Sequence, residues 1–243
     1  MTTLLVAPCS RDAARKAVER WHYSHAMPTG RLVCFGVWES GDFRGVVLFG
    51  RGANDHMLSP YGLTQAQGCE LVRVALREHD APVSQIVAEA LRLLRASSPG
   101  LRLVVSFADP EHGHHGGIYQ AGNWLYLGLT ELPPAEWVIG GRRYHARSVS
   151  AMNATARGTK RKRPGESREQ WLRRTIDARA TAIHPPRKHR YVMPLDAAMR
   201  RKLKRLARPY PRLAVEASSV TRPPSGWERQ VRPLSTAQDV REG

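Results

Sequence analysis

Side chains that could exchange protons or bind a ligand are crowded into one short stretch of this sequence: Asp109, His112, His114, His115 and Tyr119. The carboxylate of Asp109 could act as a general base, taking a proton from an attacking amine or orienting a water molecule. The phenol of Tyr119 could act as a general acid or orient an acyl carbonyl group. The structural alternatives are an Asp-Pro turn or helix cap and a core tyrosine with a satisfied hydroxyl group.

A second polar cluster lies just before Pro28: Trp21, His22, Tyr23, Ser24 and His25. Together with the histidines near Asp109, it could supply a metal site of the kind that non-haem iron enzymes use. The predicted ligands are His22, Tyr23 and Asp109. Their spacing matches no established ligand template, so a surface cluster or a base-stacking cluster is the alternative.

Two apolar, β-branched runs predict the strands that would position these residues. Leu101–Phe107 ends just before Asp109, and Cys69–Leu76 precedes a helix that begins near Pro82. Two strands joined through a helix are expected to be parallel, and ligands bind at the carboxyl ends of such strands. We therefore expect the active site around Asp109, followed by a short helix over Ile118–Asn123.

The N-terminal part of the chain predicts a helix and a β-hairpin. Arg11–Trp21 has apolar residues at helical spacing, and Leu32–Trp38 and Phe43–Gly50 are two apolar runs joined by a short polar turn. The predicted fold class is therefore α/β, or α+β, with a mixed central sheet.

The whole chain has a net charge of +17. The positive charge is concentrated in its C-terminal part. Residues 1–150 carry 15 Lys and Arg against 13 Asp and Glu, whereas residues 151–243 carry 23 against 8. This asymmetry favours a polyanionic partner. We predict a catalytic domain over residues 1–150, a basic DNA-binding extension over 151–212 and a disordered tail over 213–243.

The basic extension should bind the phosphates of double-stranded DNA, which positions a protein without reading sequence. Within it, Leu195–Ala207 is predicted to be an amphipathic helix with Leu195, Met199, Leu203 and Leu206 on one face. The predicted phosphate contacts are Arg157, Lys160, Arg161, Lys162, Arg163, Arg187, Lys188, Arg190, Lys202 and Arg205.

Cysteine content and hydropathy indicate a protein of the cytoplasm. Three widely spaced cysteines suit reduced core residues better than a disulfide framework. No apolar run is long enough to span a bilayer, and the N-terminus does not match a signal peptide. A homodimer is one oligomeric state that the sequence leaves open.

The run IYQAGNWLYLG resembles the last signature of the GCN5-related N-acetyltransferase fold. A fuller set of motifs resembles the bacteriophage Mom family: WHYSHAMPTGRLVCFGVWE, CELVRVALREHDAPVSQ, VVSFADPEHGHHGGIYQAGNW, HARS and PPRKHRY. The resemblance implies a transferase that converts adenine in DNA to an N6-carbamoylmethyl-type adenine, which resists host restriction. It also implies that Tyr23, Asp109 and Tyr119 are functionally important, with His22 beside them, and that iron and acetyl-CoA take part.

The acyl donor is left open because one acetyltransferase motif is missing. That fold usually holds the pyrophosphate of coenzyme A on a glycine-containing loop between a strand and its helix. The corresponding segment, 77–84, has no glycine and carries Glu78 and Asp80, which repel an anion. The donor could be acetyl-CoA or an aminoacyl-tRNA such as glycyl-tRNA. The predicted donor contacts are Arg73, Ser84 and Ser106.

Arg73 lies in an otherwise apolar strand, where its charge needs a partner. The candidates are Glu70 through a β-bulge, Asp109, or a phosphate of the substrate. Since the N6 amine of adenine is hydrogen-bonded inside duplex DNA, the base must be flipped out, and aromatic side chains could then stack on it. The candidates are Trp21, Tyr23, Tyr61 and Trp124. The competing class is a non-catalytic phage DNA-binding regulator that uses Leu195–Ala207 as a recognition helix.

Overall fold

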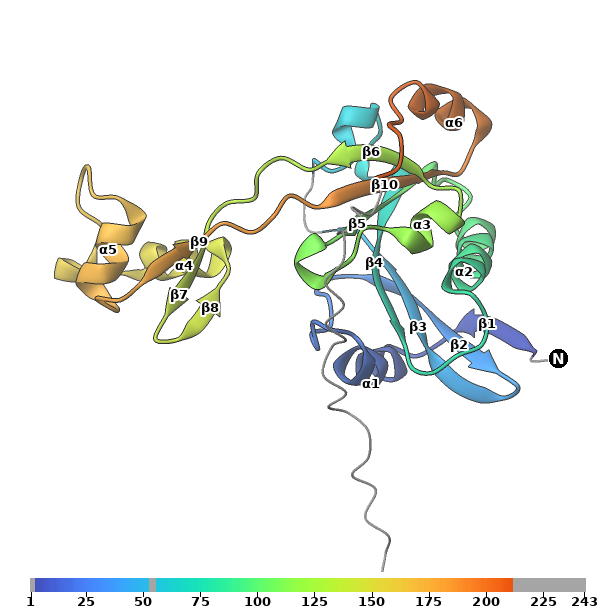
Figure 1. Cartoon of the computed structure of the whole chain (residues 1–243), viewed down its shortest axis with the longest axis horizontal. Helices are drawn as coiled ribbons and strands as arrows, with labels where there is room; N and C mark the ends of the chain where they lie inside the picture. The colour runs from blue at the N-terminus through green and yellow to red at the C-terminus, as the bar shows by residue number, and fades with distance from the viewer. Residues whose placement is uncertain (1–2, 53–55, 212–243) are drawn as a thin grey trace, which may run out of the picture. The chain divides into compact units, whose positions relative to one another are not determined.

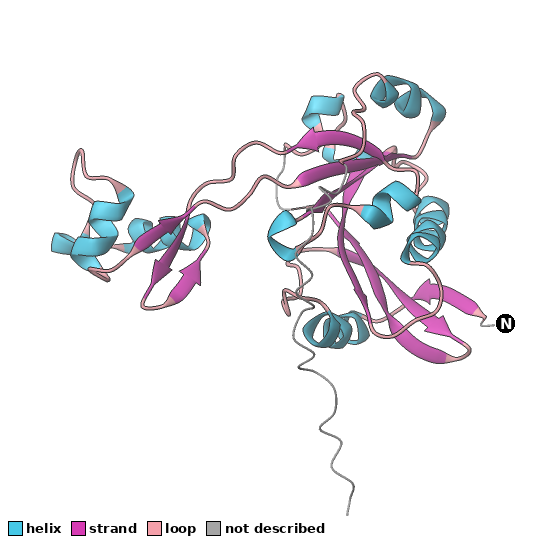
Figure 2. Ribbon diagram, in the orientation of Figure 1, coloured by secondary structure: helices cyan, strands magenta, loops and turns pink. Residues whose placement is uncertain are grey.

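The computed structural model describes residues 3–52 and 56–211, and these residues form two β-sheets with flanking helices (Figures 1 and 2). The large sheet has seven strands in the order β1-β2-β3-β4-β5-β10-β6. Its strands are β1 (Leu4–Pro8), β2 (Leu32–Glu39), β3 (Asp42–Gly50), β4 (Gly68–Leu76), β5 (Leu103–Ala108), β10 (His189–Pro194) and β6 (Leu125–Leu129). Every neighbouring pair is antiparallel except β4 and β5, which are parallel. The mixed sheet and its parallel pair confirm the predicted fold class.

Helices cover both faces of the large sheet. Helix α1 (Arg11–Trp21) packs Ala14, Ala17 and Val18 against Val46 and Leu48 on one face. Its bounds are those predicted from the apolar spacing. On the opposite face, the apolar side of α2 (Val83–Ser97) packs against a larger cluster that includes strands β1 to β5. Short helix α3 (Gly117–Ala121) belongs to the same cluster through Tyr119.

Strand β10 lies within residues 151–212, which were predicted to form a basic DNA-binding extension. It pairs with β5 on one side and β6 on the other, and Tyr191 and Val192 are fully buried. Residues 189–194 are therefore part of the large sheet and not of a separate segment. Because the surrounding sequence is highly charged, a domain boundary placed by charge composition assigns this short buried run to the basic extension.

Helix α6 (Ala197–Lys204) follows β10 and confirms the predicted amphipathic helix, although it is shorter. Met199 and Leu203 are buried against the sheet, as is Leu195 just before the helix. The prediction for Leu206 was wrong, because this residue lies beyond the helix and is 55% exposed. Strand β1 was not predicted at all, since its five residues are too few to show a clear period.

The small sheet is formed by β7 (Glu136–Ile139), β8 (Arg142–Tyr144) and β9 (Thr181–Ile183), in the order β8-β7-β9. Helices α4 (Ala146–Thr155) and α5 (Arg168–Thr175) pack on it around their own core. That core contains Trp137, Ile139, Val149, Trp171, Leu172 and Ala180. Residues 136–183 therefore form a folded part with a core of its own, on both sides of the predicted domain boundary at residue 150. The predicted disordered tail lies outside the described residues.

No helix among the described residues is both long enough and apolar enough to cross a bilayer. The cysteines Cys9, Cys34 and Cys69 are free thiols; Cys69 is buried, and Cys9 and Cys34 are half-buried.

Candidate active site between the splayed strands

A cavity of about 660 Å³ opens where β4 and β5 separate. The two strands pair only from Gly68–Glu70 to Leu103–Val105, and the later residues of both strands line the cavity. The turn between β5 and α3 and the residues that follow α1 complete its wall. The two polar clusters, which lie far apart in the sequence, therefore meet in one pocket.

A β-bulge in β4 brings Glu70 and Arg73 to the same pocket. Leu48 of β3 pairs with Arg73 and Phe49 pairs with Leu71, so Val72 is the extra residue. Both Glu70 and Arg73 line the cavity, as the bulge alternative requires. The Arg73 Nη1 atom donates to the Val72 carbonyl oxygen at 2.6 Å, whereas its buried Nε atom meets no acceptor among the described residues. Arg73 is thus a half-buried cation that lines the cavity.

Asp109 lies at the carboxyl end of β5 and is 8% exposed. Its Oδ2 atom accepts a charged hydrogen bond from Lys188 Nζ at 2.7 Å, and its Oδ1 atom accepts from the Glu111 backbone N–H at 3.1 Å. Burial alone would raise the pKa of the Asp109 carboxyl, but the bond and charge of Lys188 outweigh burial and lower the pKa below its ordinary value. Asp109 is therefore ionised at neutral pH. Lys188 was predicted as a phosphate contact, and no local pattern indicated its pairing with Asp109.

Tyr119 is buried beside the cavity and ends a chain of hydroxyl groups. The Ser106 hydroxyl donates to the Leu71 carbonyl oxygen at 2.9 Å and lies 2.8 Å from the Tyr119 hydroxyl. Since Ser106 has one proton to donate, Tyr119 must donate to Ser106 in this arrangement. Burial raises the pKa of Tyr119 to about 12, so the phenol stays protonated. Its oxygen can accept a further hydrogen bond, but a general-acid role would require the Ser106 hydroxyl to turn away from Leu71.

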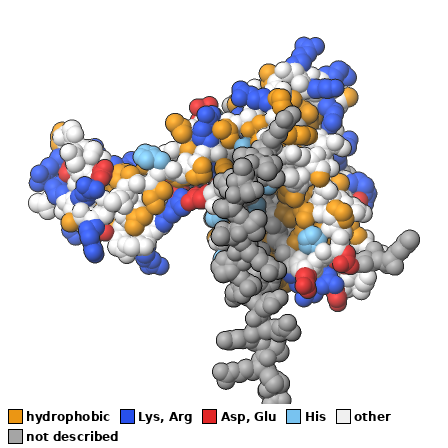
Figure 3. Space-filling model, viewed as in Figure 1, with side chains coloured by type: hydrophobic (Ala, Val, Ile, Leu, Met, Phe, Trp, Pro, Cys, Tyr) orange, Lys and Arg blue, Asp and Glu red, His pale blue; other side chains and the backbone are white. Residues whose placement is uncertain are grey.

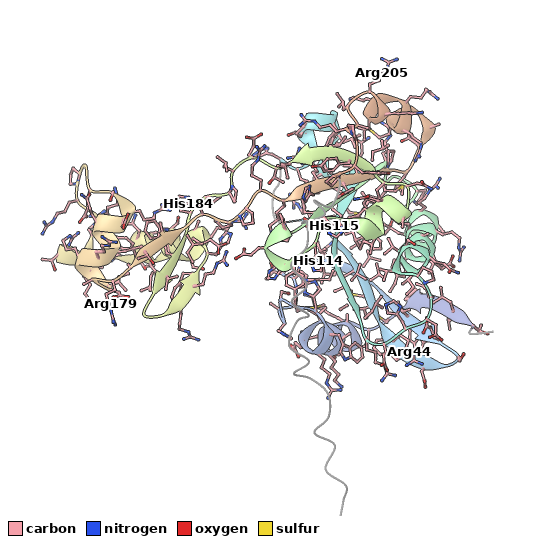
Figure 4. All side chains as sticks on the ribbon, in the orientation of Figure 1. Arg44, His114, His115, Arg179, His184 and Arg205 are labelled. Carbon is pink, nitrogen blue, oxygen red and sulfur yellow. The ribbon has the colours of Figure 1, made fainter. Side chains whose placement is uncertain are left out.

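Tyr23 bridges the residues after α1 and the turn after β5. Its ring centroid lies 4.2 Å from that of His22 and 4.1 Å from that of His112, with His114 at 5.5 Å. Figure 4 labels His114 and His115 on the turn that lies between β5 and α3. The Tyr23 side chain is 45% exposed, so one part of it remains available to a ligand.

His22 is a neutral ring at physiological pH. Its pKa is lowered to about 4, first by burial and then by the positive charge of Arg73 and the nearby histidines. The Ser24 backbone N–H donates to His22 Nδ1 at 3.1 Å, which assigns the ring proton to Nε2. His22 can therefore donate a hydrogen bond from Nε2 in the pocket without carrying charge.

The residues present do not fit the predicted iron site. Among residues 3–52 and 56–211, no three His, Cys, Asp or Glu side chains converge as metal ligands. Both oxygens of Asp109 already have partners, in Lys188 and Glu111. No step proposed below uses a metal ion.

Other predicted contacts lie outside the cavity. Ser84 is in the first turn of α2 and does not line it, and Ser106 reaches it only through Tyr119. Among the predicted stacking residues, Trp21 and Tyr23 line the cavity. Tyr61 and Trp124 are core residues, 4% and 1% exposed, so stacking on a base is excluded for them.

Tyr191 of β10 fixes the turn that forms one wall of the pocket. Its hydroxyl donates to the His115 carbonyl oxygen at 2.6 Å, and its ring stacks on Tyr119 with centroids 4.9 Å apart. The ring lies so close to Gly116 that a Cβ atom there would be 2.2 Å from it, and the φ angle of Gly116 is +91°. The turn therefore needs glycine for both backbone conformation and space.

We expect Gly116→Ala to lower the free energy of unfolding by about 2–4 kcal/mol, because left-handed strain and an overpacked contact each cost about 1–3 kcal/mol. Urea unfolding of the purified protein measures this. The matched control is Gly113→Ala, at φ +71° with no atom within 4 Å of the added Cβ, which should cost only about 1 kcal/mol. Equal effects of the two substitutions would contradict the packing role of Tyr191.

The predicted basic cluster Lys160–Arg163 lies on an ordered loop, not on a flexible linker. The Trp171 Nε1 atom donates to the Lys160 carbonyl oxygen at 2.8 Å, and Arg174 donates to the carbonyls of Thr159 and Arg161 at 2.7 and 2.9 Å. All four side chains of Lys160–Arg163 are exposed. Figure 3 shows Lys and Arg side chains gathered over the small sheet and its helices.

Arg174 is held in place by Glu166, whose carboxylate accepts from Arg174 Nε at 2.7 Å. This pair and the Arg163 backbone N–H lower the pKa of Glu166 to about 2. We name residues 157–163 the basic loop. Trp171, Arg174 and Glu166 hold the backbone of the basic loop, and the side chains of Arg157 and Lys160–Arg163 are exposed.

The remaining predicted phosphate contacts differ in how available their side chains are to DNA. Arg205 is exposed at the end of α6 (labelled in Figure 4), and Arg187 is exposed while donating to the Thr130 carbonyl oxygen. Lys202 donates to the Tyr61 carbonyl oxygen at 2.8 Å, and Arg190 interacts with the Tyr61 side chain. Lys202 and Arg190 therefore help to anchor the Tyr61 loop.

Residues 3–212 match the family model described as the Mom protein family. The chain belongs to the Mom protein family. A Mom-family relative, the methylcarbamoylase mom of Escherichia phage Mu, is 29% identical over 207 residues, which cover 82% of this chain and 80% of the relative.

Two solved structures are similar to this Mom-family chain. A Bacillus subtilis acetyltransferase in complex with CoA gives a TM-score of 0.38 at 11% identity and covers 81% of this chain and 100% of its own. FeeM, an N-acyl amino acid synthase from uncultured soil microbes, gives a TM-score of 0.39 at 13% identity, with coverages of 80% and 92%.

Proposed function

We propose that this Mom-family chain is a transferase that modifies the N6 amine of adenine in double-stranded DNA, giving an N6-carbamoylmethyl-type adenine that resists host restriction. The observation that carries the proposal is the pocket between β4 and β5, where the buried carboxylate of Asp109, the half-buried guanidinium of Arg73 and the exposed ring of Tyr23 meet. Membership of the Mom family and the similarity to a methylcarbamoylase support the reaction class.

In the proposed reaction, Asp109 is the general base. Its lowered pKa keeps it ionised, and a carboxylate can take the amine proton once bond formation makes the N6 nitrogen positive. Neutral His22 and the acceptor oxygen of Tyr119 are proposed to orient the amine. The half-buried guanidinium of Arg73, which lines the cavity, is proposed to hold the acyl donor. As the N6 nitrogen bonds to the transferred carbon, the bond between that carbon and the carrier of the donor breaks, and the carrier leaves with the electron pair of that bond.

DNA is proposed to bind through the exposed cations, with the adenine flipped out of the duplex at a cost of about a few kcal/mol. Tyr23 and Trp21, which line the cavity, are the proposed stacking partners. The basic loop would contact phosphates without reading sequence. In this proposal residues 131–187 form the DNA-binding part, and the large sheet, including β10, forms the catalytic part.

We expect Lys188→Met to shift the acid limb of the pH–rate profile to higher pH. Without Lys188, burial is the dominant influence on Asp109 and raises the pKa of its carboxyl. A base acts only above its pKa, so activity at weakly acidic pH should fall more than activity at neutral pH. Initial rates of DNA modification across this range measure the shift.

Lys162→Met is the control for this experiment, because it removes an equal charge from an exposed position on the basic loop. It should weaken DNA binding slightly and leave the position of the acid limb unchanged. An acid limb that is the same in Lys188→Met and the wild type would show that Asp109 is not the titrating base.

The competing function is a DNA-binding regulator that uses α6 for recognition. This helix buries Met199 and Leu203 and exposes its basic side chains Arg200, Arg201 and Lys204. The discriminating test uses plasmid DNA from cells that produce the protein, digested with restriction enzymes whose sites contain adenine. Resistance of this DNA supports the transferase. Full cleavage, together with sequence-specific binding by the purified protein, supports the regulator.

A further inference from the structure

The turn between β4 and α2 already binds an anion that belongs to the chain itself. The carboxylate of Glu39, the last residue of β2, accepts the Asp80 backbone N–H at 3.1 and 2.9 Å and the Ala81 backbone N–H at 2.7 Å. The Glu39 side chain is 0% exposed. The bonds from Ala81 and Asp80 lower the pKa of Glu39 despite its burial, so the carboxylate is ionised at neutral pH.

Backbone N–H groups that precede a helix are a common binding place for phosphate. In the acetyltransferase fold that the sequence resembles, the corresponding strand-to-helix loop holds the pyrophosphate of coenzyme A. Here Glu39 takes the N–H groups of Asp80 and Ala81, and the nearby Arg44 side chain, 3.6 Å away, balances its charge. A pyrophosphate at this turn would have to displace a buried carboxylate or lie against it.

We infer that Glu39 is a built-in replacement for the donor pyrophosphate, so the chain uses an acyl donor whose carrier makes no phosphate contact with the β4–α2 turn. Coenzyme A bound in the manner of the acetyltransferase fold is therefore not the donor carrier. The inference rests on the proposed function in one respect: it calls the ligand an acyl donor because a transfer reaction is proposed. Its tests measure binding and stability, so their outcome is independent of whether adenine is modified.

The first test titrates coenzyme A into the full-length wild-type protein by isothermal calorimetry. We expect no saturable heat up to millimolar concentrations, because the anion site of the turn is filled. Saturable binding of coenzyme A at micromolar concentration would overturn the inference. This test needs no variant and so does not depend on the folding of a mutant.

The second test empties the site with Glu39→Ala and supplies a small carboxylate from solution. We expect sodium acetate to raise the melting temperature of Glu39→Ala by several degrees more than sodium chloride of equal ionic strength does, since acetate can occupy the vacated N–H groups. Wild type and Glu78→Ala, which removes an exposed acid from the same turn, should show no such difference. An equal acetate effect in all three proteins would overturn the assignment.

Glu39→Gln keeps the shape of the side chain, and it is the variant to use if Glu39→Ala does not fold. A carboxyl whose pKa is lowered on folding stabilises the fold above its ordinary pKa of 4.5, and this contribution is lost as the pH falls below that value. We therefore expect Glu39→Gln to lose less stability than the wild type on acidification through this range. The same acid sensitivity in both proteins would contradict an ionised Glu39 in the turn.

Discussion

Asp109→Asn is expected to reduce the rate of DNA modification by at least about 10²-fold, the contribution typical of a positioned general base. The amide has nearly the same shape, and its single oxygen can still accept from one of the two donors, the Glu111 N–H or Lys188. It cannot take a proton from the attacking amine. The measurement is the fraction of deoxyadenosine that is modified per unit time in duplex DNA.

Two controls make the Asp109→Asn result specific. DNA affinity should be unchanged within a few-fold, because Asp109 is buried in the pocket and contributes no positive charge. Glu111→Gln alters the neighbouring carboxylate, which pairs with Arg143 on the small sheet, and should leave most activity. If Asp109→Asn retained near-wild-type activity, Asp109 would be a structural cap of the turn and not the base.

Replacing Lys160, Arg161, Lys162 and Arg163 together with Gln is expected to weaken DNA binding by about two orders of magnitude near 0.1 M salt. The same change should reduce the slope of log affinity against log salt concentration by about 3–4, roughly 0.9 for each lost phosphate contact. The loop should keep its fold, because Trp171, Arg174 and Glu166 hold its backbone and not its charged ends. Fluorescence anisotropy at several salt concentrations measures both quantities.

The comparison variant for the basic loop replaces the exposed cations Arg200, Arg201, Lys204 and Arg205 at α6. The loop variant should lose affinity equally for all DNA sequences, since phosphate contacts carry no sequence information. If binding depended mainly on α6 and were sequence-specific, the regulator would be favoured. An unchanged salt slope in the loop variant would contradict the proposed role of the loop.

Elements with a clear local period were predictable from the sequence. Helix α1 has the predicted bounds, and the parallel pairing of β4 and β5 followed from the helix between them. Asp109 and Tyr119 were predicted to lie together because strand β5 and the following turn are local features. These predictions succeeded because each depends on residues close in the chain.

Features that depend on distant residues were not predictable. β10 enters the sheet between β5 and β6, and this insertion brings Lys188 to Asp109 and Tyr191 to Gly116. Both residues lie in the motif PPRKHRY, whose charge indicated only a phosphate contact. Glu39 likewise lies 41 residues before Asp80, its partner in the β4–α2 turn, and no local pattern links the two residues.

The site combines groups whose ionisation suits acid–base chemistry near neutral pH. Asp109 is held ionised by Lys188, whereas Tyr119 and His22 are held neutral by burial. An ionised acceptor beside neutral hydrogen-bonding groups can take a proton from an amine without placing a second charge beside it. The pocket is therefore suited to an amine nucleophile such as adenine N6.

The most direct test of the central claim is mass spectrometry of nucleosides from plasmid DNA isolated from cells that produce this protein. We predict a new deoxyadenosine whose added mass is that of a carbamoylmethyl group and resides on the base. The same nucleoside should be missing from cells that produce equal amounts of soluble Asp109→Asn. Unmodified deoxyadenosine in DNA from cells with soluble wild-type protein, or a modification carried by another base, would contradict the account.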